Sequence, residues 1–443
     1  MRVLFIESRV SNPVRLSVAI PMTFLALYSY AITRLEDVEF FYHSLELDCV
    51  FGNDLSLDSI YNNYKPDIVM CTAVSCNFNS AIEILRFFKG KNTVTIIGGI
   101  FPSANDIWIL NNFDFIDIVV KGEGERTLVE VLRKIKDNSS YNNVSGISYR
   151  HEASVCTNQN RELIGNLDEL PPTLYDKIPV NMYKKCNTRY YVFASRGCCY
   201  DCDFCSLASH WQRKHRRCSI DRVLEEIAQL IRLFEPKRIS FGDDTLALDS
   251  VYFRKLCENL ASRAFPVQFG GKTRIDLINP EYLNLMRVAG FREISFGVES
   301  NNPEQLHLLN KKSIINALDS LDKILQLSEE LKYRINLNFI LGTPGETVNT
   351  LNDKAEFIIK HCSSPKVIPL LSFITPHRGT KLFMEAEKIG LKIVDHNYDH
   401  YNHLQPVCLP DTLGINGMSL LRQVYNEISK ETNSEEYNPL LEG

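Results

Sequence analysis

The sequence predicts an α/β protein with a doubly wound domain at its N-terminus, followed by a partial barrel of six β/α units. Three observations support this fold class. Runs of β-branched residues alternate with amphipathic segments through most of the 443 residues. Hairpin turns are scarce between these runs, which indicates crossover helices and parallel strands. The length suits roughly two or three domains of ordinary size.

The composition excludes several functional classes. The chain has 49 Lys and Arg against 54 Asp and Glu, a net charge of −5, and no basic stripe that would suggest a nucleic-acid partner. Its 13 cysteines are an odd number and too few for a disulfide-stapled secreted module. Residues 1–6 are typical of a strand and not of a signal peptide. We therefore expect a cytoplasmic, reducing location.

The longest uncharged stretch, residues 16–33, is interrupted by serine, threonine and proline. Because about 20 mostly apolar residues are needed to cross a bilayer, this stretch predicts a buried loop and helix. We expect no membrane span.

The first domain is expected at residues 1–140. Its strands are predicted at 3–6, 38–42, 67–72, 93–97 and 115–120, with amphipathic helices at 81–88 and 125–135. Ligands of doubly wound domains bind at the carboxyl ends of the strands. There the loops after the third and fourth strands offer Thr72, Ser75, Gly98 and Gly99, small residues that let a ligand approach the backbone. Tight turns, common to any such fold, are the alternative.

Three further parts follow. Residues 141–188 predict a connector with a hairpin at 144–150 and 155–158. Residues 189–380 predict a second series of strands, at 190–194, 238–241, 267–269, 293–296, 336–341 and 367–373, with the clearest helical periodicity at 220–234. Residues 381–443 predict a closing segment that starts helical and ends in a polar tail.

Three cysteines follow the first strand of the second series in the pattern C-x3-C-x2-C: Cys198, Cys202 and Cys205. Thiolates bind iron–sulfur clusters, and a 4Fe-4S cluster with only three protein ligands leaves one iron open for chemistry. A structural zinc site is the alternative, and its fourth ligand would be Cys199, His210 or Cys218. Because zinc motifs usually come as two separated pairs, the spacing favours a cluster.

By this triplet, its place after a strand and the ends of the later strands, residues 189–380 resemble the radical SAM superfamily. The resemblance implies a partial TIM barrel whose 4Fe-4S cluster reduces and cleaves S-adenosylmethionine (SAM) to a 5′-deoxyadenosyl radical. It also implies an external electron donor such as flavodoxin or ferredoxin.

The resemblance assigns SAM-binding roles to residues at successive strand ends. It places Phe204 and the turn containing Gly342 at the adenine of SAM. It places Arg274 at the carboxylate and Glu299 at the ribose or the amino group. Three residues are placed near the amino group: Gly242, Asp243 and Asp244. These residue types suit a zwitterion, because charge-assisted hydrogen bonds are the strong ones. The alternatives are helix caps for the two aspartates and a structural ion pair between Arg274 and Asp276.

Residues 1–188 resemble the cobalamin-binding domain that is fused to radical SAM cores in a large subclass. The matching pieces are residues 98–102, 120–125, 146–150 and 167–171. The resemblance implies a Rossmann-like domain that binds cobalamin. The sequence departs from the pattern in two ways: no D-x-H-x-x-G motif offers a histidine to the cobalt, and Phe101 stands where relatives often have histidine.

The subclass implies methylation of an unactivated carbon in a small-molecule or peptide substrate, with the methyl group delivered by cobalamin. A cobalamin-independent peptide epimerase or rearrangement enzyme is the alternative, and Cys362 and Cys408 are then the candidate hydrogen donors. A zinc-binding regulatory module is the alternative of another class. His396, His400 and His403 would share one face of a helix, and we expect a lid or substrate contact rather than a metal site.

Overall fold

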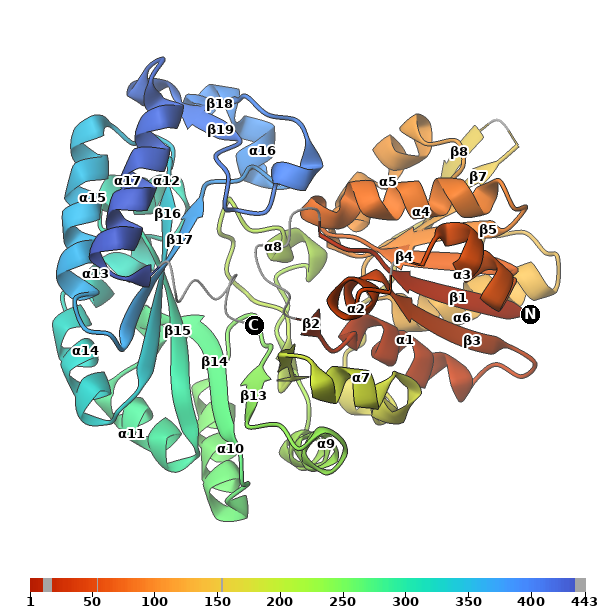
Figure 1. Ribbon diagram of the computed structural model, residues 1–443, viewed down its shortest axis with the longest axis horizontal. Coiled ribbons are helices and arrows are strands. Elements are labelled where there is room, and N and C mark those ends of the chain that lie inside the picture. The colour runs from red at the N-terminus through yellow and green to blue at the C-terminus, as the bar shows by residue number, and fades with distance from the viewer. Residues whose placement is uncertain (11–17, 54, 153, 435–443) are drawn as a thin grey trace. The chain divides into compact units, whose positions relative to one another are not determined.

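The computed structural model describes residues 1–10, 18–53, 55–152 and 154–434, and Figure 1 shows the arrangement of its elements. The chain divides into two compact units. The first comprises residues 1–188 with 209–212, and the second comprises 189–208 and the described residues from 213 onward. Across these described ranges, no helix is long and apolar enough to cross a membrane.

A seven-stranded sheet forms the centre of the first unit, in the order β3-β1-β4-β5-β6-β7-β8. Its strands are β1 (Arg2–Glu7), β3 (Glu39–Ser44), β4 (Ile68–Thr72), β5 (Val94–Gly98), β6 (Ile118–Val120), β7 (Ile147–His151) and β8 (Ser154–Thr157). The strands from β3 to β6 run parallel, and β7 and β8 extend the edge as an antiparallel hairpin. The hairpin that we assigned to a connector is therefore part of this sheet.

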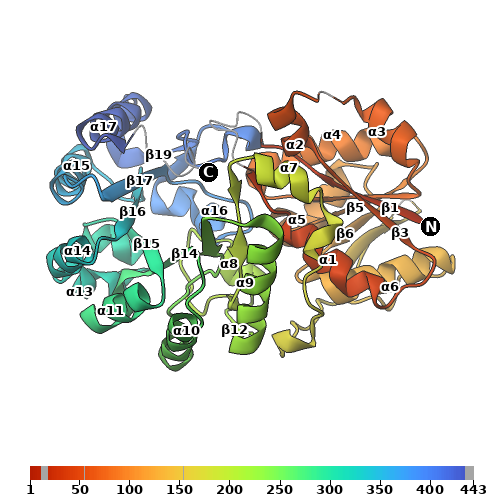
Figure 2. The same ribbon diagram turned by 60° about the horizontal axis from the view of Figure 1, so that its bottom comes forward.

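Helices cover both faces of this sheet. They are α1 (Met22–Ile32), α2 (Leu45–Phe51), α3 (Leu57–Tyr64), α4 (Phe78–Lys89), α5 (Ile100–Asn112), α6 (Gly124–Lys136) and α7 (Val180–Lys185). Figures 1 and 2 show α3 and α4 on one face and α1 and α6 on the other. Strand β1 is consequently apolar on both sides, and Val3, Leu4 and Ile6 are fully buried. Since the chain leaves β1 in one direction to β3 and crosses back to β4, the switch point at which ligands of such folds bind lies between β1 and β4.

The helix expected within residues 16–33 is α1, whose Phe24 and Leu25 are buried. Residues 16 and 17 of that prediction lie outside the described residues.

Six parallel strands form the sheet of the second unit, and they follow one another in chain order. They are β10 (Tyr191–Val192), β13 (Arg238–Phe241), β14 (Gln268–Arg274), β15 (Phe291–Glu299), β16 (Arg334–Leu341) and β17 (Val367–Phe373). The crossover helices are α9 (Ile220–Phe234), α10 (Ser250–Arg263), α11 (Pro280–Val288), α14 (Leu321–Glu330) and α15 (Val348–His361). The order is that of a partial barrel, and all six strands match predicted ones.

Helix α9 shows why the periodicity was informative. The side chain of Ser219 caps its first turn by accepting a hydrogen bond from the backbone N–H of Arg222. Val223, Ile227 and Leu230 recur on one face and are buried. The burial of this face fixes the helix against the sheet.

The closing segment packs beside the last two strands. It contains α16 (Lys381–Glu385), the antiparallel pair β18 (Leu391–Ile393) and β19 (Cys408–Pro410), and α17 (Gly417–Glu431). Leu382 and Leu391 of this segment share one apolar cluster with Ile340 and Ile374 from the ends of β16 and β17. The segment is therefore part of the second unit's core at the carboxyl edge of the sheet. Most of the expected polar tail lies outside the described residues.

Candidate active site at the carboxyl ends of the barrel strands

Cys198, Cys202 and Cys205 lie in the loop after the short strand β11 (Ser195–Arg196), and all three are half-buried. Backbone hydrogen bonds hold this loop in place. The N–H of Asp203 donates to the carbonyl of Leu309 at 3.2 Å, and the carbonyl of Asp203 accepts from the N–H of Leu382 at 2.8 Å. The three thiols are thus presented at a fixed place, although they belong to no regular element.

Positive charge faces the cysteine loop. Arg274 at the end of β14 has its Nη1 3.9 Å from the Sγ of Cys202, and its guanidinium lies 3.8 Å from the centre of the Tyr200 ring. Burial raises the pKa of the Cys202 thiol to about 11, whereas the charges of Lys311 and Arg274 lower it. Cations stabilise thiolates, so the loop fits a thiolate-bound cluster.

The described residues do not offer a site for a single metal ion. Among the residues that the structure describes, no three His, Cys, Asp and Glu side chains are grouped to hold one ion. Thiolates that hold a four-iron cluster each bind a different iron and need not converge on a point.

The two aspartates after β13 support the backbone that leads into the loop. Asp243 accepts hydrogen bonds from the N–H of Ala194 at 3.1 Å and from the hydroxyl of Ser195 at 2.5 Å, and Asp244 accepts one from the N–H of Gly197 at 3.2 Å. Asp243 is 1% exposed, and burial raises its pKa to about 6. Both its oxygens accept hydrogen bonds from the chain itself, so Asp243 supports the backbone that leads into the cysteine loop, and its contact with the amino group of SAM stays a prediction.

Gly242 makes room for an aromatic ring that the sequence interpretation missed. A Cβ on Gly242 would lie 2.5 Å from the ring of Phe193, which follows β10 and is 36% exposed. The signal available in the sequence was an aromatic residue at one strand end beside a glycine at the next. Phe193 therefore joins the candidate ligand-contacting residues.

Arg274 combines the two roles considered from the sequence. Its Nε and Nη2 lie 2.9 and 3.0 Å from the carboxylate oxygens of Asp276, and Nη2 donates to the hydroxyl of Ser313 at 2.5 Å. The expected alternative, a structural ion pair, is therefore present. It fixes the guanidinium so that Nη1 remains on the side of Cys202.

Glu299 ends β15 in the left-handed region, with φ +67°, and it is 8% exposed. Its partner is Lys311, whose Nζ forms an ion pair with Glu299 Oε1 and donates to the carbonyl of Gly297 at 2.9 Å. A Cβ on Gly297 would lie 2.7 Å from both charged groups. Lys311 was not predicted, because a Lys-Lys pair in a loop is usually solvated.

Phe204 and Gly342 lie near a common core. Phe204 packs against the cluster that contains Leu309, Ile340 and Cys408. Gly342 directly follows β16 with φ +77°, and its N–H donates to the carboxylate of Glu346. Adenine contact by these two positions stays a prediction.

The two candidate hydrogen donors occupy opposite edges of the sheet. Cys362 ends α15, which leads into the amino end of β17, so it lies a strand length away from the carboxyl ends and is buried. This position separates Cys362 from the strand ends that carry the cysteine loop, and its role as a donor stays untested. Cys408 is also buried, but its thiol donates to the carbonyl of Ile374 just beyond β17, at 3.2 Å.

The three histidines of the closing segment do not share a helix, although His400 ends a short 3-10 helix, Tyr398–His400. His400 pairs with Asp395 at 2.7 Å, while His403 contacts His377 with 3.3 Å between their Nε2 atoms. Burial and the neighbouring His403 lower the pKa of His377. The three histidines therefore share no helix face, and their role as a lid or substrate contact stays a prediction. His377, four residues after the end of β17, is a partner of His403 that the sequence did not reveal.

In the first unit, the structure brings together the loops after β4 and β5. Gly99 has φ +105°, and a Cβ there would lie 2.6 Å from both the carbonyl oxygen of Ala73 and Oγ1 of Thr72. The N–H of Ala73 donates to the carbonyl of Gly98 at 2.9 Å. Thr72, Gly98 and Gly99 therefore form one backbone surface beside the switch point. Ser75 in the same loop is buried.

Phe101, in the position of the missing histidine, is 3% exposed. Its ring lies 4.6 Å from that of Phe78 and contacts Trp108. This residue therefore stabilises α5 against α4.

Residues 192–358 match the family model of the radical SAM superfamily. This part of the chain is therefore a radical SAM domain, and the protein is an enzyme of the radical SAM class.

The chain is also similar to two proteins that carry functional names. The chain is 26% identical over 372 residues to a protein of Pyrococcus horikoshii named as an uncharacterized methyltransferase, with 82% of this chain and 79% of the relative covered. It is 28% identical over 379 residues to an anaerobic magnesium-protoporphyrin IX monomethyl ester cyclase of Rubrivivax gelatinosus, with 82% of this chain and 66% of the relative covered.

A solved structure of the radical SAM methyltransferase TsrM from Kitasatospora setae, with cobalamin and a 4Fe-4S cluster bound, superposes with a TM-score of 0.76 at 15% identity. It covers 98% of this chain and 90% of TsrM. The predicted fold class, a doubly wound domain with a partial barrel, is thereby confirmed.

Proposed function

We propose that the protein is a cobalamin-dependent radical SAM methyltransferase that methylates a carbon atom of its substrate. The observation that carries the proposal is the cysteine loop at the carboxyl edge of a partial barrel, where the thiol of Cys202 lies 3.9 Å from the guanidinium of Arg274. The likeness to TsrM and the methyltransferase relative support the methyl-transfer step.

The cofactors supply the electron for SAM cleavage and the methyl group, and the chain's residues bind and orient. Cys198, Cys202 and Cys205 would hold the cluster. Arg274, whose other nitrogens are engaged, would use Nη1 for the carboxylate of SAM. Glu299, fixed by Lys311, would accept from the ribose or the amino group.

In the first unit, the backbone around Thr72, Gly98 and Gly99 would approach the corrinoid. Phe101 is packed among aromatic rings and offers no ligand to cobalt, so the corrinoid would be held by shape and backbone contacts. The remaining assignments are a small-molecule or peptide substrate, a flavodoxin or ferredoxin as electron donor, and a cytoplasmic location.

A second candidate is a radical SAM epimerase that uses Cys408 as the hydrogen donor. The position of Cys408 next to the carbonyl of Ile374, at the carboxyl end of β17, favours this thiol over Cys362. Solvent deuterium entering the product at the substrate's α-carbon, with no methyl group gained, would identify this reaction.

The test begins with protein purified anaerobically from a cobalamin-replete host, reconstituted with iron and sulfide. We expect a 4Fe-4S absorbance, a retained corrinoid, and 5′-deoxyadenosine after addition of SAM and dithionite. The C198A/C202A/C205A variant should lose the cluster and all SAM cleavage while keeping the corrinoid.

The C199A variant is the matched control, since Cys199 lies in the same loop outside the C-x3-C-x2-C pattern. It should keep the cluster and SAM cleavage. One zinc per chain, lost in C199A, would contradict the enzyme hypothesis, and a colour due to the cluster alone would contradict the cobalamin step.

A further inference from the structure

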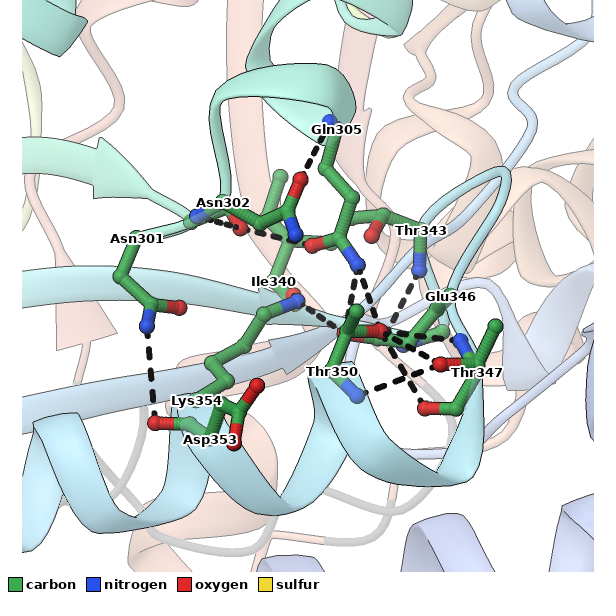
Figure 3. Close-up of polar contacts among 12 residues, drawn as sticks. Asn301, Asn302, Gln305, Ile340, Thr343, Glu346, Thr347, Thr350, Asp353 and Lys354 are labelled. Atoms are coloured by element: carbon green, nitrogen blue, oxygen red, sulfur yellow. Dashed lines mark hydrogen bonds and ion pairs between the residues drawn. The ribbon is translucent and has the colours of Figure 1, made fainter.

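Two charged side chains in the second unit are fully buried and face each other (Figure 3). Glu346 lies in the turn after β16, and Lys354 lies in the second turn of α15, where it forms an ion pair with Glu346. Both are 0% exposed. Replacing a buried ion pair by well-packed apolar residues is often neutral or stabilising, so stability alone does not account for this pair.

The hydrogen bonds of the pair end on the backbone of the strand and turn. Glu346 Oε2 accepts from the N–H of Gly342 at 2.5 Å and from the N–H of Thr343 at 3.1 Å. Lys354 Nζ donates to the carbonyl of Ile340 at 2.8 Å. Together the two side chains fix three points around the end of β16 (Figure 3).

The same carboxylate is connected to the neighbouring strand end. Gln305 of α12 (Pro303–Leu308) donates from Nε2 to Glu346 Oε1 at 3.3 Å, and its Oε1 accepts from the hydroxyl of Ser300 at 2.6 Å. Ser300 directly follows Glu299. A buried network of hydrogen bonds therefore connects the ends of β15 and β16, next to the candidate SAM site.

We propose that Glu346 is a positioning residue for SAM binding and that Lys354 compensates its buried charge. The carboxylate of Glu346 accepts hydrogen bonds from both N–H groups of the turn, which starts at Gly342 in the left-handed region. The ammonium of Lys354 pairs with that carboxylate and donates to the carbonyl of Ile340 near the end of β16. This inference rests on the proposed function, since the turn matters only if it contacts SAM. Without the acceptor, the turn relaxes and SAM binds more weakly, while the cysteine loop is unaffected.

Two double variants separate this role from stability. E346L/K354M and E346Q/K354M both remove the buried charges, but only the glutamine of E346Q/K354M keeps a carbonyl oxygen for the two N–H groups. SAM affinity is measured in reconstituted full-length protein from the change that SAM causes in the EPR spectrum of the reduced cluster. We expect affinity about tenfold weaker in E346L/K354M and within about threefold of wild type in E346Q/K354M.

Equal SAM affinity in a folded E346L/K354M variant would overturn the inference. If that variant does not fold, E346D keeps the charge opposite Lys354 but shortens the reach to the turn, and wild-type affinity in E346D overturns the inference equally. The control is Y333F, which removes a buried hydroxyl that donates to the carbonyl of Leu283 at the amino end of the barrel. Y333F should lower stability without changing SAM affinity.

The proposed function fails separately. If wild-type protein with an intact cluster shows no SAM-dependent EPR change, the SAM site itself is refuted. If wild type responds to SAM and the two double variants respond alike, only the positioning role is refuted.

Discussion

The two units use the carboxyl ends of their parallel strands differently. In the second unit the ends of β14 and β15 carry charged side chains that have largely buried partners: Arg274 pairs with Asp276, and Glu299 pairs with Lys311. In the first unit the corresponding ends carry small residues whose backbones are closely packed, with Gly99 as the tightest point. Side-chain charge suits a zwitterionic ligand, whereas exposed backbone suits a large ring system that is recognised by shape.

The pairing in the second unit has a physical advantage. A buried charge without a partner is strongly unfavourable, so a site that waits for ligand must keep its charges compensated. A zwitterion brings one charge of each sign and no net charge. The charged groups of the two pairs can therefore also interact with the carboxylate and ammonium of SAM, and no charge is left without a partner.

The largest effect is expected from breaking one of these pairs. E299Q removes the partner of Lys311 and the acceptor proposed for SAM, so 5′-deoxyadenosine formation in a single turnover should fall about 100-fold. R238M is the matched control, because Arg238 pairs with Glu293 in a half-exposed position at the amino end of β13 and β15. Exposed pairs contribute little, and R238M should react at the wild-type rate. An E299Q rate equal to wild type would remove Glu299 from the site.

The first unit is tested by adding a methyl group rather than removing a charge. In G99A the new Cβ would meet Ala73 and Thr72 at 2.6 Å, and the left-handed backbone adds strain. We expect corrinoid retention after purification to fall about tenfold, with SAM cleavage unchanged.

G52A provides the control for backbone strain. Gly52 has φ +66°, but a Cβ there would meet nothing within 4 Å. G52A should therefore retain the corrinoid. Full retention in G99A would show that the loop after β5 does not contact the corrinoid.

The sequence predicts features that depend on neighbouring residues, and it does not predict pairs whose members come from different elements. Each parallel strand was predictable, because runs of residues such as 68–72 are apolar on both faces and are bounded by turns. The cysteine loop was predictable because its three cysteines are close in sequence. Arg274 and Glu299 were found through their places at strand ends, and the pairing of Arg274 with Asp276 was among the alternatives, but the pairing of Glu299 with Lys311 was not predicted.

The missed residues share one physical feature: their partners come from another element. Lys311, Gln305 and Lys354 lie in loops or helices where polar residues are normally solvated, and periodicity records only apolar burial. Likewise, nothing local separates Cys362 from Cys408, since only the direction of α15 and β17 places one at each edge. The four-part division of the chain stays a prediction, although the hairpin at β7 and β8 joins the first sheet.

The smallest expected effect concerns Asp243, which supports the cysteine loop. Burial raises its pKa to about 6 from an ordinary value of 3.8. The folded protein thus holds this proton more tightly than the unfolded chain does. The resulting stability is complete below pH 3.8 and is lost as the pH rises through about 6.

Between pH 5 and pH 8, Asp243 should therefore lower the free energy of unfolding by roughly 1–2 kcal/mol. In D243N the side chain cannot ionise, and the pH dependence of the free energy of unfolding, measured by chemical denaturation, should flatten by that amount. D276N is the control: burial acts to raise the pKa of Asp276, but the hydrogen bonds and charge of Arg274 hold it below 3.8. Asp276 therefore stays ionised from pH 5 to 8, and D276N should shift stability by a constant amount. An unchanged slope in D243N would mean that Asp243 is ionised in the folded protein at pH 5, with Ser195 and Ala194 compensating its burial.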